Sequence, residues 1–79
     1  MDVLWVGKGT YINNELVVSI TEFKHPQAKK HIKAAKENGS LLDYTAGEKT
    51  ESVLLLSNGI VVMSILEPYE IVEWLKENK

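Results

Sequence analysis

The feature that most constrains this chain is an Asn-Gly pair between two apolar runs. Ser57, Asn58 and Gly59 separate the runs at residues 53–56 and 60–66. This arrangement predicts a β-hairpin, because Asn58 and Gly59 both accept the positive φ that a tight turn needs. Both runs are apolar at consecutive positions, so both faces of the hairpin must be covered. We therefore expect it at the centre of a sheet, with a helix on one face and a second helix or a neighbouring subunit on the other.

Two helices are marked by their ends and by their apolar spacing. A helix over residues 26–38 begins with Pro26 and is followed by Gly39, which suits the left-handed residue after a helix. Its narrow apolar stripe consists of Ala28, Ile32 and Ala35. A second helix, over residues 68–77, begins with Pro68 and places three apolar residues on one face: Ile71, Trp74 and Leu75.

Short β-branched and aromatic runs predict the remaining strands. We expect strands at residues 3–6, 10–12, 16–20 and 41–44, with a glycine turn at residues 7–9. Asn13 and Asn14 predict a hairpin turn between the second and third of these strands. The expected fold class is α+β, a mostly antiparallel sheet with two helices, in a single small domain spanning residues 1–79.

The length of the chain favours self-association. A domain of 79 residues buries only about 60–65% of the surface that its unfolded chain exposes, which leaves a monomer marginally stable. The chain has no cysteine, so neither a disulfide nor a cysteine zinc site can stabilise it. We therefore expect a homo-oligomer.

Charge is distributed unevenly along the chain. Residues 24–36 contain five lysines and no acid, whereas the remaining residues contain four lysines and eleven acids, a net charge of −7. The chain has no arginine, the residue that makes most bidentate contacts with phosphate and guanine. Lysines still neutralise phosphates as point charges, so non-specific nucleic-acid binding remains open. A merely solvated helix face, or a basic helix docked on an acidic neighbouring subunit, are the alternatives.

The residues needed for catalysis are missing from the sequence. The histidines, His25 and His31, lie about 240° apart around one predicted helix and cannot share a metal from it. Gly7 to Thr10 resemble a phosphate loop only superficially, because a β segment follows. Asp43, an acid among apolar neighbours, is expected to make a turn or interface hydrogen bond. We expect no enzyme activity, no cofactor, no metal and no small-molecule substrate.

The apolar runs are too short for a membrane span, and the N-terminus has no secretory signal, so we expect a cytoplasmic protein.

One stretch of the chain resembles a known family. Residues 32–50 resemble the approximate pattern I-x-x-A-R-x-x-G-x-L-I-D-A-T-x-G-R-R-T-R of the bacterial RemA family of extracellular-matrix (biofilm) regulators, whose last position falls at Glu51. Outside that stretch, the matching motifs are Gly7-Lys8-Gly9 for G-F-G, Ser19-Ile20 for S-I, and Ser64 to Pro68 for S-x-x-x-P. The alignment runs without gaps from about residue 4 to residue 75.

The resemblance implies a small cytoplasmic DNA-binding transcriptional regulator that assembles into a ring-shaped homo-oligomer. Leu16, Glu48 and Glu51 stand where the family has arginine, and Glu48-Lys49 replaces the Arg-Arg pair that the family uses for DNA binding. We expect this chain to contact phosphates through lysines instead, namely Lys49, Lys29, Lys30, Lys33 and Lys36. The alternative is a relative that keeps the ring, has lost DNA binding and serves as an assembly or protein-interaction module.

Overall fold

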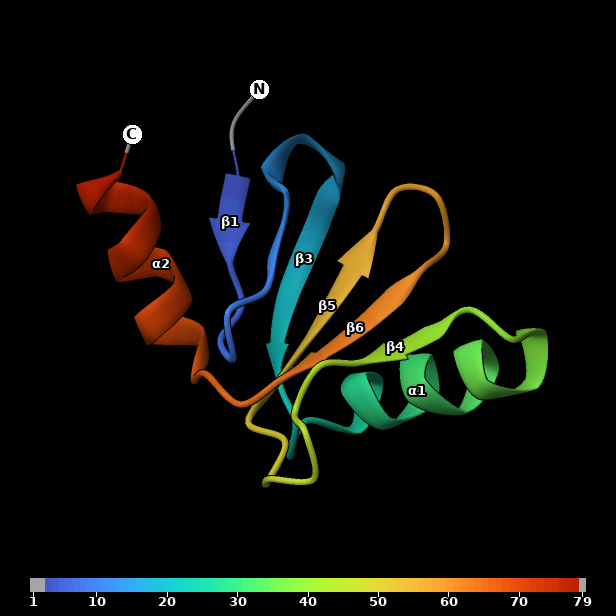
Figure 1. Ribbon diagram of the computed structural model, residues 1–79. Coiled ribbons are helices and arrows are strands. Elements are labelled where there is room, and N and C mark those ends of the chain that lie inside the picture. The colour runs from blue at the N-terminus through green and yellow to red at the C-terminus, as the bar shows by residue number, and fades with distance from the viewer. Residues whose placement is uncertain (1–2, 79) are drawn as a thin grey trace.

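The computed structural model describes residues 3–78, which form two sheets and two α-helices (Figure 1). In chain order the elements are β1 (Val3–Trp5), β2 (Tyr11–Asn13), the 3-10 helix η1 (Asn14–Leu16), β3 (Val17–Glu22), α1 (Pro26–Asn38), β4 (Leu41–Asp43), β5 (Ser52–Leu56), β6 (Val61–Ser64) and α2 (Pro68–Glu77). The α+β class is confirmed, and both helices have the predicted bounds.

The predicted β5–β6 hairpin is present and lies at the centre of the larger sheet. The strand order of that sheet is β3-β5-β6-β4. At the turn, Gly59 has a φ of +87°, and the Asn58 side chain accepts a hydrogen bond of 3.1 Å from the Ile60 amide. β4 pairs parallel with β6, whereas the other pairings are antiparallel. The parallel pair arises because α1 connects β3 to β4 as a crossover.

α1 covers one face of the hairpin. Ala28 and Ala35 are buried against Val53 of β5 and Val61 of β6. The two alanines have short side chains, so the helix axis can approach the sheet closely. Ile32 packs at the edge of the same cluster. The predicted apolar stripe of this helix is therefore confirmed.

α2 and the β1–β2 hairpin together cover the opposite face. Ile71 of α2 is fully buried with Leu4 and Val6, against Leu54 and Val62 of the central hairpin. Trp74 and Leu75 pack on the edge of this cluster. We predicted a second helix or a neighbouring subunit on this face of the central hairpin, and the structure has a second helix there. The β1–β2 hairpin shares the face with it, which the sequence did not predict (Figure 1).

The predicted hairpin at Asn13 and Asn14 is wrong. β2 pairs with β1 instead, through the glycine turn at residues 7–9, while β3 joins the larger sheet. Asn13 has a φ of −74°, and its side chain accepts a 2.9 Å hydrogen bond from the Glu15 amide, which caps η1. The asparagine thus begins a 3-10 helix that carries the chain from one sheet to the other.

Both ends of α1 are capped. At the start, His25 Nδ1 accepts a 3.1 Å hydrogen bond from the Gln27 amide, a role that the sequence analysis missed. At the end, Gly39 has a φ of +70°, and the Ser40 amide donates to the Ala35 carbonyl at 2.9 Å. Gly39 therefore has the left-handed conformation predicted for it.

Gly7→Ala is expected to destabilise the fold by about 2–4 kcal/mol. Gly7 has a φ of +93°, and a Cβ at this position would approach Ile65 Cγ1 to 2.9 Å. The substitution thus combines backbone strain with overpacking. Gly9→Ala is the matched control, because Gly9 has a φ of +72° in the same turn but open space around its Cα. Urea unfolding should show a clearly larger loss for Gly7→Ala, and equal losses would contradict the packing argument.

Candidate nucleic-acid interface

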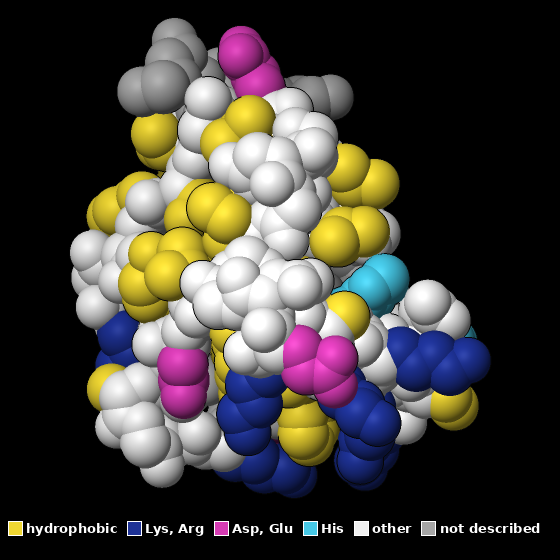
Figure 2. Space-filling view, turned by 90° about the vertical axis from the view of Figure 1, so that its right-hand side faces the viewer, with side chains coloured by type: hydrophobic (Ala, Val, Ile, Leu, Met, Phe, Trp, Pro, Cys, Tyr) yellow, Lys and Arg dark blue, Asp and Glu magenta, His cyan; other side chains and the backbone are white. Residues whose placement is uncertain are grey.

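The predicted lysines of α1 all project into solvent. Lys29, Lys30, Lys33 and Lys36 are exposed. Lys29, Lys33 and Lys36 are spaced by four and three residues, so they share one side of the helix, and Lys30 lies about 100° further around it. Figure 2 shows lysine side chains gathered at the lower end of the molecule, the end at which Figure 1 places α1 and the β4–β5 loop. None of these four lysines forms an ion pair within residues 3–78.

Lys49 lies in the β4–β5 loop and meets the start of α1 at a pocket. The pocket has a volume of about 300 Å³. Three lysines from separate segments line it: Lys24 from the β3–α1 connection, Lys29 from α1, and Lys49. Lys30, Lys33 and Lys36 are not among its lining residues and extend the basic surface along the helix.

The pocket also contains an aromatic ring and three carboxylates. Phe23 is half-buried, and Lys29 Nζ lies 5.1 Å from the centroid of its ring, a cation–π contact. The acidic lining residues are Glu22, Glu51 and Glu67. Glu51 lies 4.0 Å from the Lys49 ammonium, so this carboxylate partly neutralises the loop lysine.

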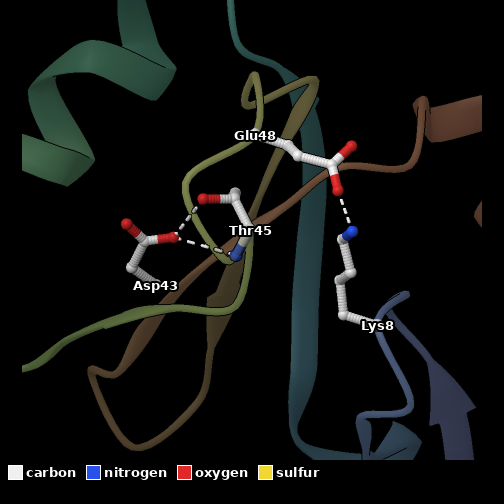
Figure 3. Close-up of polar contacts among 4 residues, drawn as sticks. All are labelled: Lys8, Asp43, Thr45 and Glu48. Carbon is white, nitrogen blue, oxygen red and sulfur yellow. Dashed lines mark hydrogen bonds and ion pairs between the residues drawn. The ribbon is translucent and has the colours of Figure 1, made fainter.

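Glu48 forms an ion pair with Lys8 of the β1–β2 turn (Figure 3). The pair joins two loops that are 40 residues apart in the sequence, and both side chains remain partly exposed. The negative charge of Glu48 is thereby partly neutralised by a lysine from another segment of the chain. Such a pair contributes at most about 1 kcal/mol to folding, because solvent screens it.

The loop that carries Lys49 is shaped by Asp43 and Thr45. Asp43 Oδ1 accepts hydrogen bonds from the Thr45 hydroxyl at 2.6 Å and the Thr45 amide at 2.9 Å (Figure 3). These two bonds lower the pKa of the Asp43 carboxyl. Ala46 and Gly47 follow with φ values of +53° and +84° and complete the turn. The expected turn hydrogen bond of Asp43 is confirmed.

The structure brings together part of the predicted site. It places Lys29 and Lys49 at one pocket, and it adds Lys24 and Phe23, which the site prediction omitted. Lys24 could have been included, because it belongs to the acid-free segment at residues 24–36. Phe23 gave no such signal, since a lone aromatic before a helix indicates core packing equally well. In residues 3–78 no group of three or more His, Cys, Asp or Glu side chains is placed to hold a metal ion.

Comparisons with known proteins identify the family of this chain. Residues 3–75 match the sequence model of the RemA-like family, described as extracellular matrix regulatory protein A-like. The chain belongs to the RemA-like family. A relative from Finegoldia magna is 32% identical over 68 residues, covering 86% of this chain and 82% of its own. Relatives from Bacillus cytotoxicus and Bacillus mycoides are each 29% identical over 79 residues, covering all of this chain and 91% of their own. All three are named "Putative regulatory protein", not enzymes.

The positions that depart from the RemA-like pattern have distinct surroundings in the structure. Leu16 is half-buried and packs against the core cluster of α2 and β1, so an apolar contact stands where the family has a cation. Glu48 pairs with Lys8, and Glu51 lies beside Lys49. Between residues 3 and 78, neither helix has the length and apolar character that crossing a membrane requires.

Asp43→Ala is expected to lower the free energy of unfolding by about 1 kcal/mol at pH 7, because it removes the acceptor of the buried Thr45, while solvent screens the exposed carboxylate. The pKa of Asp43 is lower in the folded state than in the unfolded state. Its stabilisation is therefore full above the unfolded pKa, near 3.9, and is lost as the pH falls through the lower folded pKa.

The measurement is guanidinium unfolding at pH 7 and at pH values below 4. The difference between the wild type and Asp43→Ala should shrink at the lower pH. Asp43→Asn keeps an acceptor oxygen and does not titrate, so its stability should be intermediate at pH 7. A wild-type advantage that persists undiminished at low pH would contradict this role of the carboxylate.

Proposed function

We propose that this protein is a cytoplasmic DNA-binding transcriptional regulator that acts as a homo-oligomer, in the extracellular-matrix (biofilm) class to which the RemA-like family belongs. The observation that carries the proposal is the convergence of lysines from three segments at one end of α1. Lys24, Lys29 and Lys49 line one pocket, and Lys30, Lys33 and Lys36 extend the basic surface from it. The rest of the chain is acidic, so this concentration of positive charge is local.

Such a surface would bind DNA chiefly through phosphates. Ammonium groups neutralise phosphates without reading base edges, and the chain lacks the arginines that make most bidentate base contacts. Each subunit would therefore bind weakly. A ring of subunits would add many such contacts through a high effective concentration, which compensates for the weakness of each.

Exposed apolar residues support self-association away from the lysines. Val3 and Tyr11 of the β1–β2 hairpin and Tyr69 and Val72 of α2 are exposed by 41% or more. The hairpin and α2 lie on the face of the central sheet opposite to α1 (Figure 1). Subunit contacts through these residues would leave α1 free to meet DNA.

One observation favours the second candidate, an assembly module without DNA binding. Glutamates are concentrated in and just before α2, at positions 67, 70, 73 and 77. α1 and α2 lie on opposite faces of the sheet, so a head-to-tail contact would place a basic helix against a neighbour's acidic helix. The α1 lysines would then fix the orientation of subunits instead of binding DNA.

Charge reversal on each helix separates the two candidates. Lys33→Glu and Lys76→Glu change the net charge equally, and Lys76 lies on α2. The DNA-binding proposal predicts that Lys33→Glu weakens duplex binding about three- to tenfold at low salt, because a phosphate contact is lost and a repulsion is added, while Lys76→Glu has little effect. Fluorescence anisotropy with a labelled duplex measures both affinities.

The oligomer is measured in parallel by light scattering. In the double variant Lys29→Glu/Lys33→Glu, DNA binding should disappear while the oligomer keeps its mass. A double variant that falls apart into smaller species would instead support the assembly module. Unchanged DNA binding in this variant would contradict the proposed surface.

A further inference from the structure

The pocket at the start of α1 has a lining that simple phosphate contacts do not explain. A surface that only neutralises DNA would be uniformly basic, yet this pocket combines three lysines with three glutamates and one aromatic ring. Glu51 lies beside Lys49, whereas Glu22 and Glu67 form no ion pair within the described part of the chain. The Glu67 side chain already caps α2 by accepting a hydrogen bond from the Glu70 amide, so Glu22 is the lining carboxylate that is available to accept hydrogen bonds from a ligand.

The lining defines the chemistry of a matching ligand. The ammonium groups require an anionic group, the free Glu22 carboxylate requires a hydrogen-bond donor, and Phe23 offers contact to a flat apolar group. A nucleotide whose base carries an exocyclic amino group meets all three requirements. An inorganic anion meets only the first, and a polyamine meets only the second.

We propose that this pocket binds a single unstacked nucleotide, with its phosphate at Lys24, Lys29 and Lys49 and its base against Phe23. The inference rests on the proposed function, because Lys29 and Lys49 belong to both surfaces. Lys29 lies over the Phe23 ring at present. Its side chain is exposed and flexible, so it can leave the ring for the phosphate when a base takes its place.

The Glu22 carboxylate makes the pocket selective among bases. Cytosine carries an exocyclic amino group, which donates a hydrogen bond to a carboxylate, whereas thymine carries a carbonyl at the same position, which a carboxylate repels. Glu22 adjoins Phe23 in the sequence and also lines the pocket. We therefore assign the preference for amino-bearing bases to Glu22.

The test is a titration of the ¹⁵N-labelled protein followed by amide chemical shifts, with dCMP, dTMP and deoxyribose 5-phosphate at matched ionic strength. We expect saturable shifts at residues 22–24 and 49–51 with dissociation constants in the millimolar range for dCMP. Affinity should fall about threefold or more from dCMP to dTMP and again to the sugar phosphate. Equal affinity for all three, or no saturable shift at these residues, would overturn the proposal.

Variants test the assigned roles. Phe23→Leu keeps an apolar side chain against α1 and should weaken dCMP about fivefold while leaving the sugar phosphate unchanged. Glu22→Gln should reduce the preference for dCMP over dTMP. Lys76→Gln is the control, because Lys76 lies on α2 outside the pocket and the basic surface, so its dCMP affinity should equal that of the wild type. Loss of dCMP binding in Lys76→Gln to the same extent as in Phe23→Leu would contradict the site.

Two further arms identify the source of the nucleotide and separate this inference from the proposed function. If a short oligo-dC strand binds more tightly than dCMP, the nucleotide that occupies the pocket comes from nucleic acid. If dCMP binds and the strand does not, the ligand is a free nucleotide. Either result supports the proposed pocket. If dCMP binds but duplex DNA does not, the proposed DNA-binding function is contradicted and the proposed nucleotide pocket is supported. If duplex binds and depends on Lys33 while no nucleotide binds, only the pocket fails.

Discussion

Burial of the β5–β6 hairpin on both faces is the constraint from which the rest of this structure follows. Leu54, Leu56 and Val62 face one side, and Val53 and Val61 face the other. Each side needs its own cover, so the two helices are forced to opposite faces of the sheet. The same burial therefore separates the basic helix α1 from the acidic helix α2 (Figure 1). The separation of the two helices is thus a consequence of how a small chain covers its central strands, although Glu67, just before α2, still lines the pocket at the start of α1.

The candidate interface depends on that arrangement at one end of the sheet. β3 leads into α1 and carries Glu22 to its edge, while the β4–β5 loop returns to the same end with Lys49. Asp43 and Thr45 hold the turn of this loop, and the Lys8–Glu48 pair connects it to the β1–β2 turn. At the three positions where the family pattern has arginine, Glu48 pairs with Lys8, Glu51 lies beside Lys49, and Leu16 packs on the core cluster. Within residues 3–78, the lysines that form no ion pair are Lys24 and the four of α1.

The sequence predicts those parts of the fold that depend on local signals. Asn58-Gly59 identifies the central hairpin, and the proline and glycine residues at the helix ends fix α1 and α2. The hairpin predicted at Asn13 was wrong, because an asparagine caps a 3-10 helix through its side chain as readily as it adopts a positive φ. The Lys8–Glu48 pair and the pocket at Phe23 could not be predicted. They join segments that are distant in the sequence. The pairing of β3 with β5 brings Phe23 beside Glu51, and the tertiary packing brings the β1–β2 turn to the β4–β5 loop.

The central claim, that this fold presents a phosphate-binding lysine surface, is tested most directly by the salt dependence of DNA affinity. The dissociation constant for a labelled duplex would be measured across a series of salt concentrations, with the oligomeric mass determined in each buffer. The account predicts a linear fall of log affinity with log salt, with a slope of about −0.9 for each phosphate neutralised, at constant oligomeric mass. An intact oligomer that binds no duplex even at low salt would contradict it.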